Sequence, residues 1–253
     1  MFMNKLLNFF EYKDHRAIDK WHHYFEIYER YLNKYKDQNI TILEIGVSHG
    51  GSLQMWNDYF GKGSQIYGVD INPHCKIFEE ANVKIFIGSQ SDRIFLRELK
   101  NAIPRLDILI DDGGHMMDQQ KITFEELFDH VKDDGIYICE DLHTSYWLSH
   151  GGGYRRRGTF IEFSKNLIDY LHGWHSRQKN FKANKYSKSI FGLHFHDSIL
   201  VIEKRNIIKP FCSKRGKPGF VEEPDYSNRV SFQKKVENYW NALLARFRIA
   251  KHF

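Results

Sequence analysis

Residues 43–52 read LEIGVSHGGS and lie where one pattern of hydrophobicity changes into another. The buried-strand pattern ITILEIGV at 40–47 ends there, and the helical pattern SLQMWNDYF follows at 52–60. Glycines between a strand and a helix let the backbone approach a ligand closely, at the carboxyl end of a sheet where ligands bind. The stretch therefore predicts a ligand-binding loop near the start of an α/β domain.

The same change from strand to helix recurs along the chain. Helical patterns separate four further buried-strand patterns, which are QIYGVD at 65–70, VKIFIG at 83–88, LDILIDD at 106–112 and GIYICED at 135–141. Strands that alternate with helices of this length predict βαβ units and a parallel sheet. The residues FGLHFHDSILVIEK at 191–204 read as two extended stretches joined near Asp197, which would add an antiparallel pair.

The glycine loop can be compared with two cofactor-binding patterns. The dinucleotide fingerprint G-x-G-x-x-G would need glycine at position 48, where a serine stands. The methyltransferase pattern acid-x-Gly-x-small-x-Gly instead fits Glu44, Gly46, Ser48 and Gly50. Glu44 would repel a phosphate but could accept a hydrogen bond from an ammonium group. Because S-adenosylmethionine has an amino acid tail and no phosphate, the loop predicts this cofactor.

Further cofactor contacts are expected at the ends of the following strands. Asp70 ends QIYGVD, where a carboxylate can accept hydrogen bonds from both ribose hydroxyls. Ser89 and Gln90 follow the next strand and are placed to bracket the adenine. Ser52 and Asp111 complete the predicted cofactor residues. The alternative for each of these residues is an ordinary turn or a surface cap.

These patterns predict an α/β, Rossmann-like class I methyltransferase fold, with a mostly parallel seven-stranded sheet flanked by helices. Aromatic residues at helical spacing between Arg16 and Tyr35 predict an amphipathic helix before the sheet, and another helix is expected from Ser231 to Arg248. We therefore predict three segments: an N-terminal helical segment at 1–37, the cofactor-binding domain at 38–205, and a C-terminal loop and helix at 206–253.

Two motifs that carry acids and histidine follow neighbouring strands. One runs from Asp111 to His115 and the other from Cys139 to His143. The carboxyl ends of parallel strands reach the same edge of a sheet, so four carboxylates and two imidazoles should gather beside the cofactor. Adjacent residues on a strand face opposite ways, so we expect Asp111 on the cofactor side and Asp112 on the acceptor side.

The gathered acids predict a metal site. Clustered carboxylates repel one another unless a proton or a cation is present, and Mg²⁺ prefers carboxylate and water oxygens. We predict Asp112, Glu140 and Asp141 as ligands of a metal ion that lowers the pKa of an acceptor hydroxyl. We predict His115 as the general base that removes the proton. The alternative is a set of helix caps and surface charges. His143 is a candidate for substrate contact, and its alternative is a structural histidine.

Five segments carry a resemblance to a known family: LEIGVSHGGSLQMW, GVDINP, IDDGGHMMDQQ, EDLHTSYW and GGGYRRRGTFIEF. They resemble the metal-dependent sugar O-methyltransferases of macrolide biosynthesis, which include the mycinamicin and macrocin enzymes, bacterial glycan methyltransferases and cephalosporin hydroxylase-like proteins. The resemblance runs from about Asp19 to Lys204 and implies Mg²⁺ at the three predicted acids, with His115 as base. It also implies that Tyr24, in the aromatic segment DKWHHYFEIYERYL, helps to shape the active site.

Three consecutive arginines bear on the acceptor. Arg155, Arg156 and Arg157 lie in a glycine-rich loop after the predicted metal ligands. Such a loop can fold over the acceptor as a lid, and arginine binds phosphate through paired, charge-assisted hydrogen bonds. We therefore predict a small anionic or nucleotide-linked acceptor, such as a sugar or phosphate-bearing precursor in surface glycan (capsule polysaccharide) or natural-product biosynthesis. The alternative is a solvated surface loop.

Other functions stay open at this point. The basic stretch ARFRIAKHF at 245–253 permits a tRNA methyltransferase, although the net charge of +5, from 37 basic and 32 acidic residues, is small. The acids and histidines permit a metal-dependent hydrolase or oxygenase without S-adenosylmethionine, although no two-histidine, one-carboxylate set stands at an obvious spacing. The fold also permits a binding protein without catalysis.

The composition favours a cytoplasmic protein. No window holds eighteen consecutive apolar residues, which argues against a membrane span. The N-terminal residues MFMNKLLNFFEYKDH lack a small-residue cleavage site and do not read as a signal peptide. The three cysteines, Cys75, Cys139 and Cys212, fit neither a disulfide framework nor a zinc cluster. Aromatic faces on the N- and C-terminal helices permit packing between subunits of a homo-oligomer.

Overall fold

The computed structural model describes residues 4–14, 16–217, 219 and 231–246. They fall in two compact units, Met1–Pro210 and Phe211–Phe253, and each unit is described by itself. The second unit contains helix α7 (Phe232–Arg246), inside the helix predicted from Ser231 to Arg248. Positions 247–253, with most of the basic C-terminal stretch, lie outside the described residues. The predicted boundaries near residues 37 and 205 stay predictions. Among the described residues, no helix combines the length and the apolar character needed to cross a membrane.

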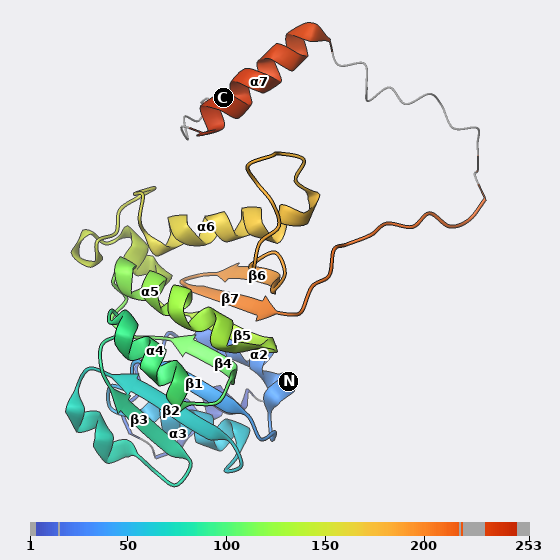
Figure 1. The fold of residues 1–253 in the computed structure, drawn as a ribbon. Helices are drawn as coiled ribbons and strands as arrows, with labels where there is room; N and C mark the ends of the chain where they lie inside the picture. Colours follow the sequence, from blue (N-terminus) through green and yellow to red (C-terminus); the bar gives the residue numbers. More distant parts are fainter. Residues whose placement is uncertain (1–3, 15, 218, 220–230, 247–253) are drawn as a thin grey trace. The chain divides into compact units, whose positions relative to one another are not determined.

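The first unit is built on a seven-stranded sheet. Its strands are β1 (Thr41–Ile45), β2 (Gln65–Asp70), β3 (Val83–Ile87), β4 (Leu106–Asp111), β5 (Val131–Cys139), β6 (Ile190–His196) and β7 (Ile199–Lys204). They lie in the order β3-β2-β1-β4-β5-β7-β6 (Figure 1). The strands from β3 to β5 in this order pair in parallel, and β7 runs antiparallel to both β5 and β6. The predicted Rossmann-like class I methyltransferase sheet is confirmed.

Helices cover both faces of this sheet. Because side chains alternate along a strand, the neighbours Ile42 and Leu43 in β1 belong to different apolar clusters. The cluster with Ile42 includes residues of α1 (Lys5–Tyr12), α2 (Tyr24–Leu32) and α3 (Gly51–Phe60). The cluster with Leu43 includes residues of α4 (Arg93–Ala102), α5 (Met117–Leu127) and α6 (Phe160–Leu171). Figure 1 shows α4 and α5 crossing the near face of the sheet, so the unit has three layers.

The segment before α2 departs from the prediction. A helix is expected from Arg16 to Tyr35, but α2 begins only at Tyr24 and residues 17–21 are not helical. The backbone oxygens of residues 16 and 17 lie 2.3 and 2.5 Å from where a Cβ on Gly51 would stand. The segment therefore runs against the first turn of α3, where glycine leaves room for it. Its tertiary contacts override the helical pattern of the sequence.

Three strand ends meet at one edge of the sheet. The register pairs Ile45 of β1 with Asp111 of β4, and Asp111 with Cys139 of β5. The ladder continues for one more step, because the Asp112 amide donates to the Ile45 carbonyl and the Glu140 amide to the Asp111 carbonyl, both at 2.9 Å. This register places the glycine loop and the two acidic motifs side by side.

A buried isoleucine in β4 and an exposed isoleucine on α4 offer a matched test of the core. Ile110 in β4 is fully buried, whereas Ile94 on α4 is 67% exposed. We expect Ile110→Ala to lower the free energy of unfolding by about 2–5 kcal/mol, because it leaves a cavity. Ile94→Ala removes the same atoms from the surface and should change it by at most about 0.5 kcal/mol. Urea denaturation followed by circular dichroism measures both, and equal losses would contradict this packing.

Candidate active site

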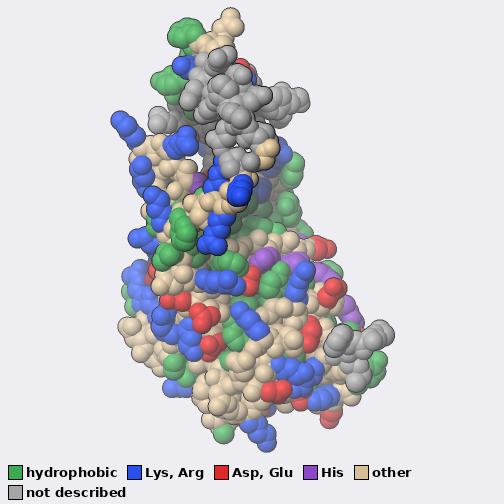
Figure 2. Space-filling model, turned by 90° about the vertical axis from the view of Figure 1, so that its right-hand side faces the viewer, with side chains coloured by type: hydrophobic (Ala, Val, Ile, Leu, Met, Phe, Trp, Pro, Cys, Tyr) green, Lys and Arg blue, Asp and Glu red, His purple; other side chains and the backbone are tan. Residues whose placement is uncertain are grey.

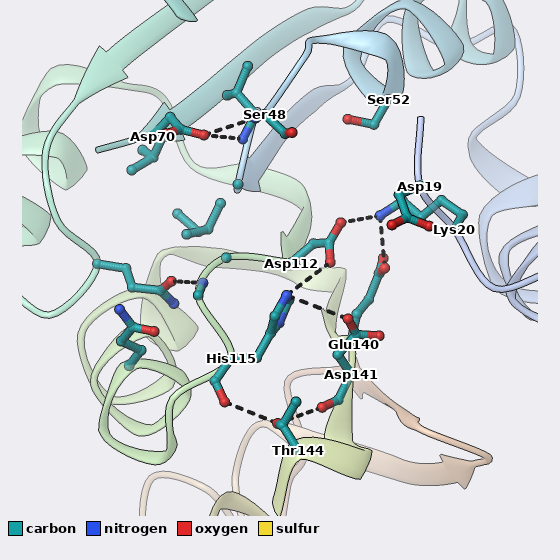
Figure 3. Close-up of a pocket in the computed structure, with 18 of the residues that line it drawn as sticks. Asp19, Lys20, Ser48, Ser52, Asp70, Asp112, His115, Glu140, Asp141 and Thr144 are labelled. Atoms are coloured by element: carbon teal, nitrogen blue, oxygen red, sulfur yellow. Dashed lines mark hydrogen bonds and ion pairs between the residues drawn. The ribbon is translucent and has the colours of Figure 1, made fainter. Parts of the chain in front are cut away.

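A cavity of about 690 Å³ lies at this edge of the sheet (Figure 3). Its walls come from the segment before α2, from the loops after β1, β2 and β3, and from the two acidic motifs after β4 and β5. The size suits a small-molecule ligand, since ligand pockets measure about 300–1,000 Å³. The position of each site residue predicted from the sequence can therefore be given relative to this one cavity.

Six of the predicted cofactor residues line the cavity: Gly46, Ser48, Ser52, Asp70, Ser89 and Gln90. Glu44, Gly50 and Asp111 do not line it. Gly50 instead faces Phe78, whose ring carbons lie 2.7 and 2.8 Å from where a Cβ on Gly50 would stand. The roles of these residues in binding a cofactor stay predictions.

Asp70 fixes the shape of the glycine loop. Its Oδ2 accepts hydrogen bonds from the backbone amides of Val47 and Ser48, both at 2.9 Å, and its Oδ1 accepts one from the Asn72 amide at 2.8 Å. Gly46 has a φ of +97°, and a Cβ there would lie 2.1 Å from the carbonyl oxygen of Asp112. The loop after β1 is therefore in direct contact with the loop that carries the first acidic motif.

Glu44 lies behind the loop rather than in the cavity. It is fully buried, and Ser52 donates a hydrogen bond to its Oε2 at 2.7 Å. Burial raises the pKa of Glu44 to about 7, although the nearby Lys20 ammonium opposes the shift. Glu44 therefore acts on the cavity through Ser52 and Lys20, which both line it.

Asp111 supports Gln90. Gln90 Nε2 donates to Asp111 Oδ1 at 3.0 Å and lies 3.1 Å from Thr123 Oγ1, and Gln90 Oε1 accepts from the Gly114 amide at 2.8 Å. Burial raises the pKa of Asp111 to about 6. Asp111 is thus a buried support for the turn after β4, and it does not face the cavity as predicted. The expectation that Asp111 and Asp112 face opposite ways agrees with this placement.

Asp112, His115 and Asp141 face one another across the cavity. Each offers one possible ligand atom, and these atoms lie within 4.8 Å of one another. His115 Nε2 is 3.5 Å from Asp141 Oδ2 and 3.9 Å from Asp112 Oδ1. Burial lowers the pKa of His115 more than Asp141 raises it, which favours the neutral imidazole. The Tyr24 hydroxyl lies 2.9 Å from Asp141 Oδ1 and helps to hold that carboxylate in place.

Glu140, another predicted metal ligand, has both carboxylate oxygens occupied. Tyr28 donates to Oε1 at 2.5 Å, and the Lys20 ammonium donates to Oε2 at 2.8 Å. Lys20 also donates to Asp112 Oδ2. Burial, followed by the charge of Asp112, raises the pKa of Glu140 to about 8. Burial likewise raises the pKa of Asp112 to about 7, against the pull of Lys20. The single positive charge of Lys20 therefore does not neutralise all the carboxylates of this cluster.

Lys20 is a site residue that sequence reasoning missed, as are Trp21 and Trp147 in the cavity wall. A lysine at the start of an amphipathic pattern reads as a surface charge, and its partners Asp112 and Glu140 lie 92 and 120 positions away. Burial lowers the pKa of the Lys20 ammonium, but Asp112 and Glu140 raise it further, so its pKa lies well above the ordinary value. The one available signal was the excess of acids at the strand ends, which calls for a cation.

An aromatic rim, formed by Trp21, His143 and Trp147, borders the cavity. The His143 ring lies between the two indoles, with centroids 5.6 Å from Trp21 and 4.6 Å from Trp147. His143 Nδ1 is 2.5 Å from the Ser198 hydroxyl, which holds the ring in place. Trp21 and Trp147 are 54% and 49% exposed, so about half of each residue is open to solvent.

The three arginines do not line the cavity. Arg155 lies at a separate, smaller pocket, with its guanidinium 5.3 Å from the centroid of the Tyr154 ring. Arg156 donates to the Gly152 carbonyl at 3.2 Å, and the side chains of Arg155, Arg156 and Arg157 are exposed. The predicted arginine lid over the acceptor is therefore not part of the cavity wall that the structure describes.

Two glycines test the close contact between the loops. Gly46 and Gly61 have φ of +97° and +91°, but only Gly46 faces another backbone, since a Cβ on Gly61 would meet nothing within 4 Å. We expect Gly61→Ala to lower the free energy of unfolding by about 1–3 kcal/mol, because its φ of 91° and ψ of 162° lie in a region that essentially only glycine adopts. Gly46→Ala should cost about 1–3 kcal/mol more, because the carbonyl of Asp112 must move. Chemical denaturation measures both, and equal losses would argue against the contact.

No protein-family model matches the chain, but curated proteins do. The 8-demethyl-8-alpha-L-rhamnosyl tetracenomycin-C 2'-O-methyltransferase of Streptomyces olivaceus is 37% identical over 198 residues, covering 74% of this chain and 52% of the relative. The mycinamicin VI 2''-O-methyltransferase of Micromonospora griseorubida is 34% identical over 188 residues, covering 70% of this chain and 47% of the relative. The chain thus spans about half the length of the curated relatives it matches.

Solved structures agree with these relatives. The MycE methyltransferase from the mycinamycin biosynthetic pathway, in complex with Mg and SAH, superposes with a TM-score of 0.70 at 29% identity. That match covers 87% of this chain and 57% of MycE. A MycE complex with Mg, SAH and mycinamycin VI gives a TM-score of 0.69 at 30% identity, over 88% of this chain and 56% of MycE. Over most of its length, the chain is therefore a homologue of the sugar O-methyltransferases of the mycinamicin, macrocin and tetracenomycin type, as its five motif segments predict.

Proposed function

We propose that this chain is an S-adenosylmethionine-dependent, magnesium-assisted O-methyltransferase that acts on a sugar hydroxyl. The observation that carries the proposal is that one cavity holds both the glycine loop after β1 and the facing group of Asp112, His115 and Asp141. A methyl donor and an acceptor hydroxyl can therefore meet in a single site. The related proteins are themselves named O-methyltransferases, which supports the same chemistry.

The part of the cavity next to β1 and β2 fits the adenosyl cofactor. Gly46 and Ser48 bring backbone rather than bulk to the cavity wall, and Asp70 adds a carboxylate at the end of β2, where ribose hydroxyls are bound in this type of sheet. Ser89 lines the cavity after β3, beside the place expected for the base. The amide of Gln90 is held by Asp111 and the Gly114 amide, so Gln90 shapes this wall.

The opposite part of the cavity fits a magnesium ion. Asp112 Oδ1 and Asp141 Oδ2 are carboxylate oxygens that face the same space, as Mg²⁺ prefers. Glu140 is the third proposed ligand, although Lys20 and Tyr28 bind its oxygens in this structure. When bound, such an ion stabilises the negative charge that develops on an acceptor oxygen.

His115 is the proposed general base. Its lowered pKa leaves the imidazole neutral near pH 7, and its Nε2 points towards the two carboxylates. In the proposed reaction, His115 takes the hydroxyl proton as the acceptor oxygen attacks the methyl carbon of the donor. The bond between that carbon and sulfur breaks, and S-adenosylhomocysteine leaves. General-base help of this kind contributes about 10²–10⁴-fold in rate.

The aromatic rim favours a sugar as acceptor. Trp21 and Trp147 are half-exposed and line the cavity, and an indole can pack against the apolar side of a sugar ring while leaving its hydroxyls free. The anionic or nucleotide-linked acceptor, and the surface-glycan precursor, rest on the arginine loop alone, which lies outside the cavity wall. We therefore propose a glycosylated small molecule, with the sugar hydroxyl as the methylated group.

The other candidate functions have less support from the described residues. On the face that Figure 2 shows, Lys and Arg side chains are interspersed with Asp and Glu over the sheet-bearing part of the molecule, whereas nucleic acid is bound by a continuous basic surface. The candidate metal group holds one histidine and two aspartates, whereas non-haem iron oxygenases use two histidines and one carboxylate. Methyl transfer to a sugar hydroxyl accounts for both halves of the cavity.

Titration calorimetry with S-adenosylhomocysteine tests the cofactor site. We expect the wild type to bind it, and Asp70→Ala to weaken binding by about ten-fold or more, because a charged acceptor for hydrogen bonds is lost. Asp118→Ala is the matched control, since Asp118 lies on the exposed surface of α5 and should leave binding unchanged. A well-folded wild type that does not bind S-adenosylhomocysteine would sink the proposal.

The base is tested by methyl transfer to rhamnosides and related glycosides in the presence of Mg²⁺. We expect His115→Ala to reduce kcat by about 10²–10⁴-fold while leaving the affinity for S-adenosylhomocysteine unchanged. The control is His172→Ala, because His172 is exposed at the end of α6 and outside the cavity. Full activity of His115→Ala would show that the proton is removed by another group.

A further inference from the structure

A buried lysine lies inside the acidic cluster and plays no part in the mechanism described above. The Lys20 side chain is 2% exposed, and its Nζ lies 2.8 Å from Glu140 Oε2 and 3.8 Å from Glu44 Oε1. It also donates a hydrogen bond to Asp112 Oδ2. Figure 3 shows the ammonium between the carboxylates of Asp112 and Glu140, on the side away from His115.

The charges around Lys20 do not balance. The carboxylates of Asp112, Glu140 and Asp141 line this end of the cavity, and the buried Glu44 lies behind it, 3.8 Å from the ammonium. Lys20 is the one lysine or arginine among the residues that line the cavity in the described chain. A carboxylate buried without a cation or a proton is costly, so the ammonium stabilises the cluster when no metal is present. It satisfies only part of the negative charge.

The ammonium and a magnesium ion would use the same acids. Lys20 takes Oδ2 of Asp112 and Oε2 of Glu140, whereas Oδ1 of Asp112 faces His115 Nε2 at 3.9 Å. Mg²⁺ lies about 2.0–2.1 Å from its oxygen ligands. An ion bound to either acid would therefore stand within a few ångströms of a positive charge that is shielded from water, and the two cations would repel each other strongly.

We propose that Lys20 is a built-in cation that shares Asp112 and Glu140 with the divalent metal and thereby limits how tightly this chain binds it. The inference rests on the proposed function, because it concerns the magnesium ion of that site. Lys20 has two consequences. The acidic side chains keep their arrangement when no metal is bound. The affinity for Mg²⁺ is lower than it would be without Lys20, because the ammonium competes for the same carboxylates.

Titration calorimetry with Mg²⁺ alone, on the full chain, tests this inference. We expect Lys20→Met to bind Mg²⁺ about ten-fold more tightly or better than the wild type, because the competing charge is gone. The variant should also melt at a lower temperature without metal, and Mg²⁺ should raise its Tm more than that of the wild type. Lys20→Gln keeps a hydrogen-bond donor without the charge and provides the same comparison if the methionine variant does not fold.

The chain offers a matched control in Lys204. This lysine is 4% exposed, but it donates to the backbone carbonyls of Phe128 and Val131 at 2.9 and 2.6 Å, outside the cavity wall. Lys204→Met removes a buried ammonium from another part of the fold. We expect Lys204→Met to lower Tm relative to the wild type by the same amount with and without Mg²⁺. Its affinity for Mg²⁺ should equal that of the wild type.

The outcomes separate this inference from the proposed function. If the wild type binds Mg²⁺ and both uncharged Lys20 variants bind it no more tightly, the inference is overturned and Lys20 only orients the ligands. If the wild type binds S-adenosylhomocysteine but neither it nor the variants bind Mg²⁺, the metal part of the proposed function fails and the inference fails with it. If only the variants bind Mg²⁺, the inference is supported in its strongest form.

Discussion

The hydrogen-bond register between β1, β4 and β5 is the constraint on which the site depends. It aligns Ile45, Asp111 and Cys139, so the residues that follow them leave the sheet at one edge. Two acidic motifs far apart in sequence are thereby forced into one small space. A parallel sheet brings its strand ends together at little cost in free energy when the residues there are apolar. Here it concentrates carboxylates, and their mutual repulsion must be offset.

That repulsion explains the shape of the N-terminal segment. The pattern from residue 16 onwards is helical, but a helix there would keep Lys20 away from Asp112 and Glu140. Residues 17–21 are instead not helical, and the segment runs against α3 at Gly51, where no side chain blocks it. The ion pairs of Lys20 and the contact at Gly51 are tertiary interactions, and such interactions override the few tenths of a kcal/mol per residue that helix propensity contributes. The non-helical segment is therefore tied to the sheet edge by contacts with residues about ninety or more positions away along the chain.

This also explains how much could be predicted from the sequence. The strands, most helices and the opposite orientation of Asp111 and Asp112 follow from hydrophobic periodicity, which is local. The glycine loop and the acidic motifs are likewise local patterns at strand ends. Lys20, the support of Gln90 by Asp111, and the outward position of the arginines depend on partners that are distant along the chain. No spacing rule reports these contacts, because each is created by the tertiary fold.

Backbone strain points to the same cavity as the charges do. Ser48, His115 and Asp141 have φ of 49°, 54° and 54°, and each of them lines the cavity from a different loop. Non-glycine residues keep such conformations only where their surroundings enforce them, and they cluster at functional sites. Asp70 holds Ser48 through its amide, and Thr144 Oγ1 lies 3.0 and 2.8 Å from the carbonyls of His115 and Asp141. The fold thus uses polar side chains of Asp70 and Thr144 to hold three loops that line one cavity.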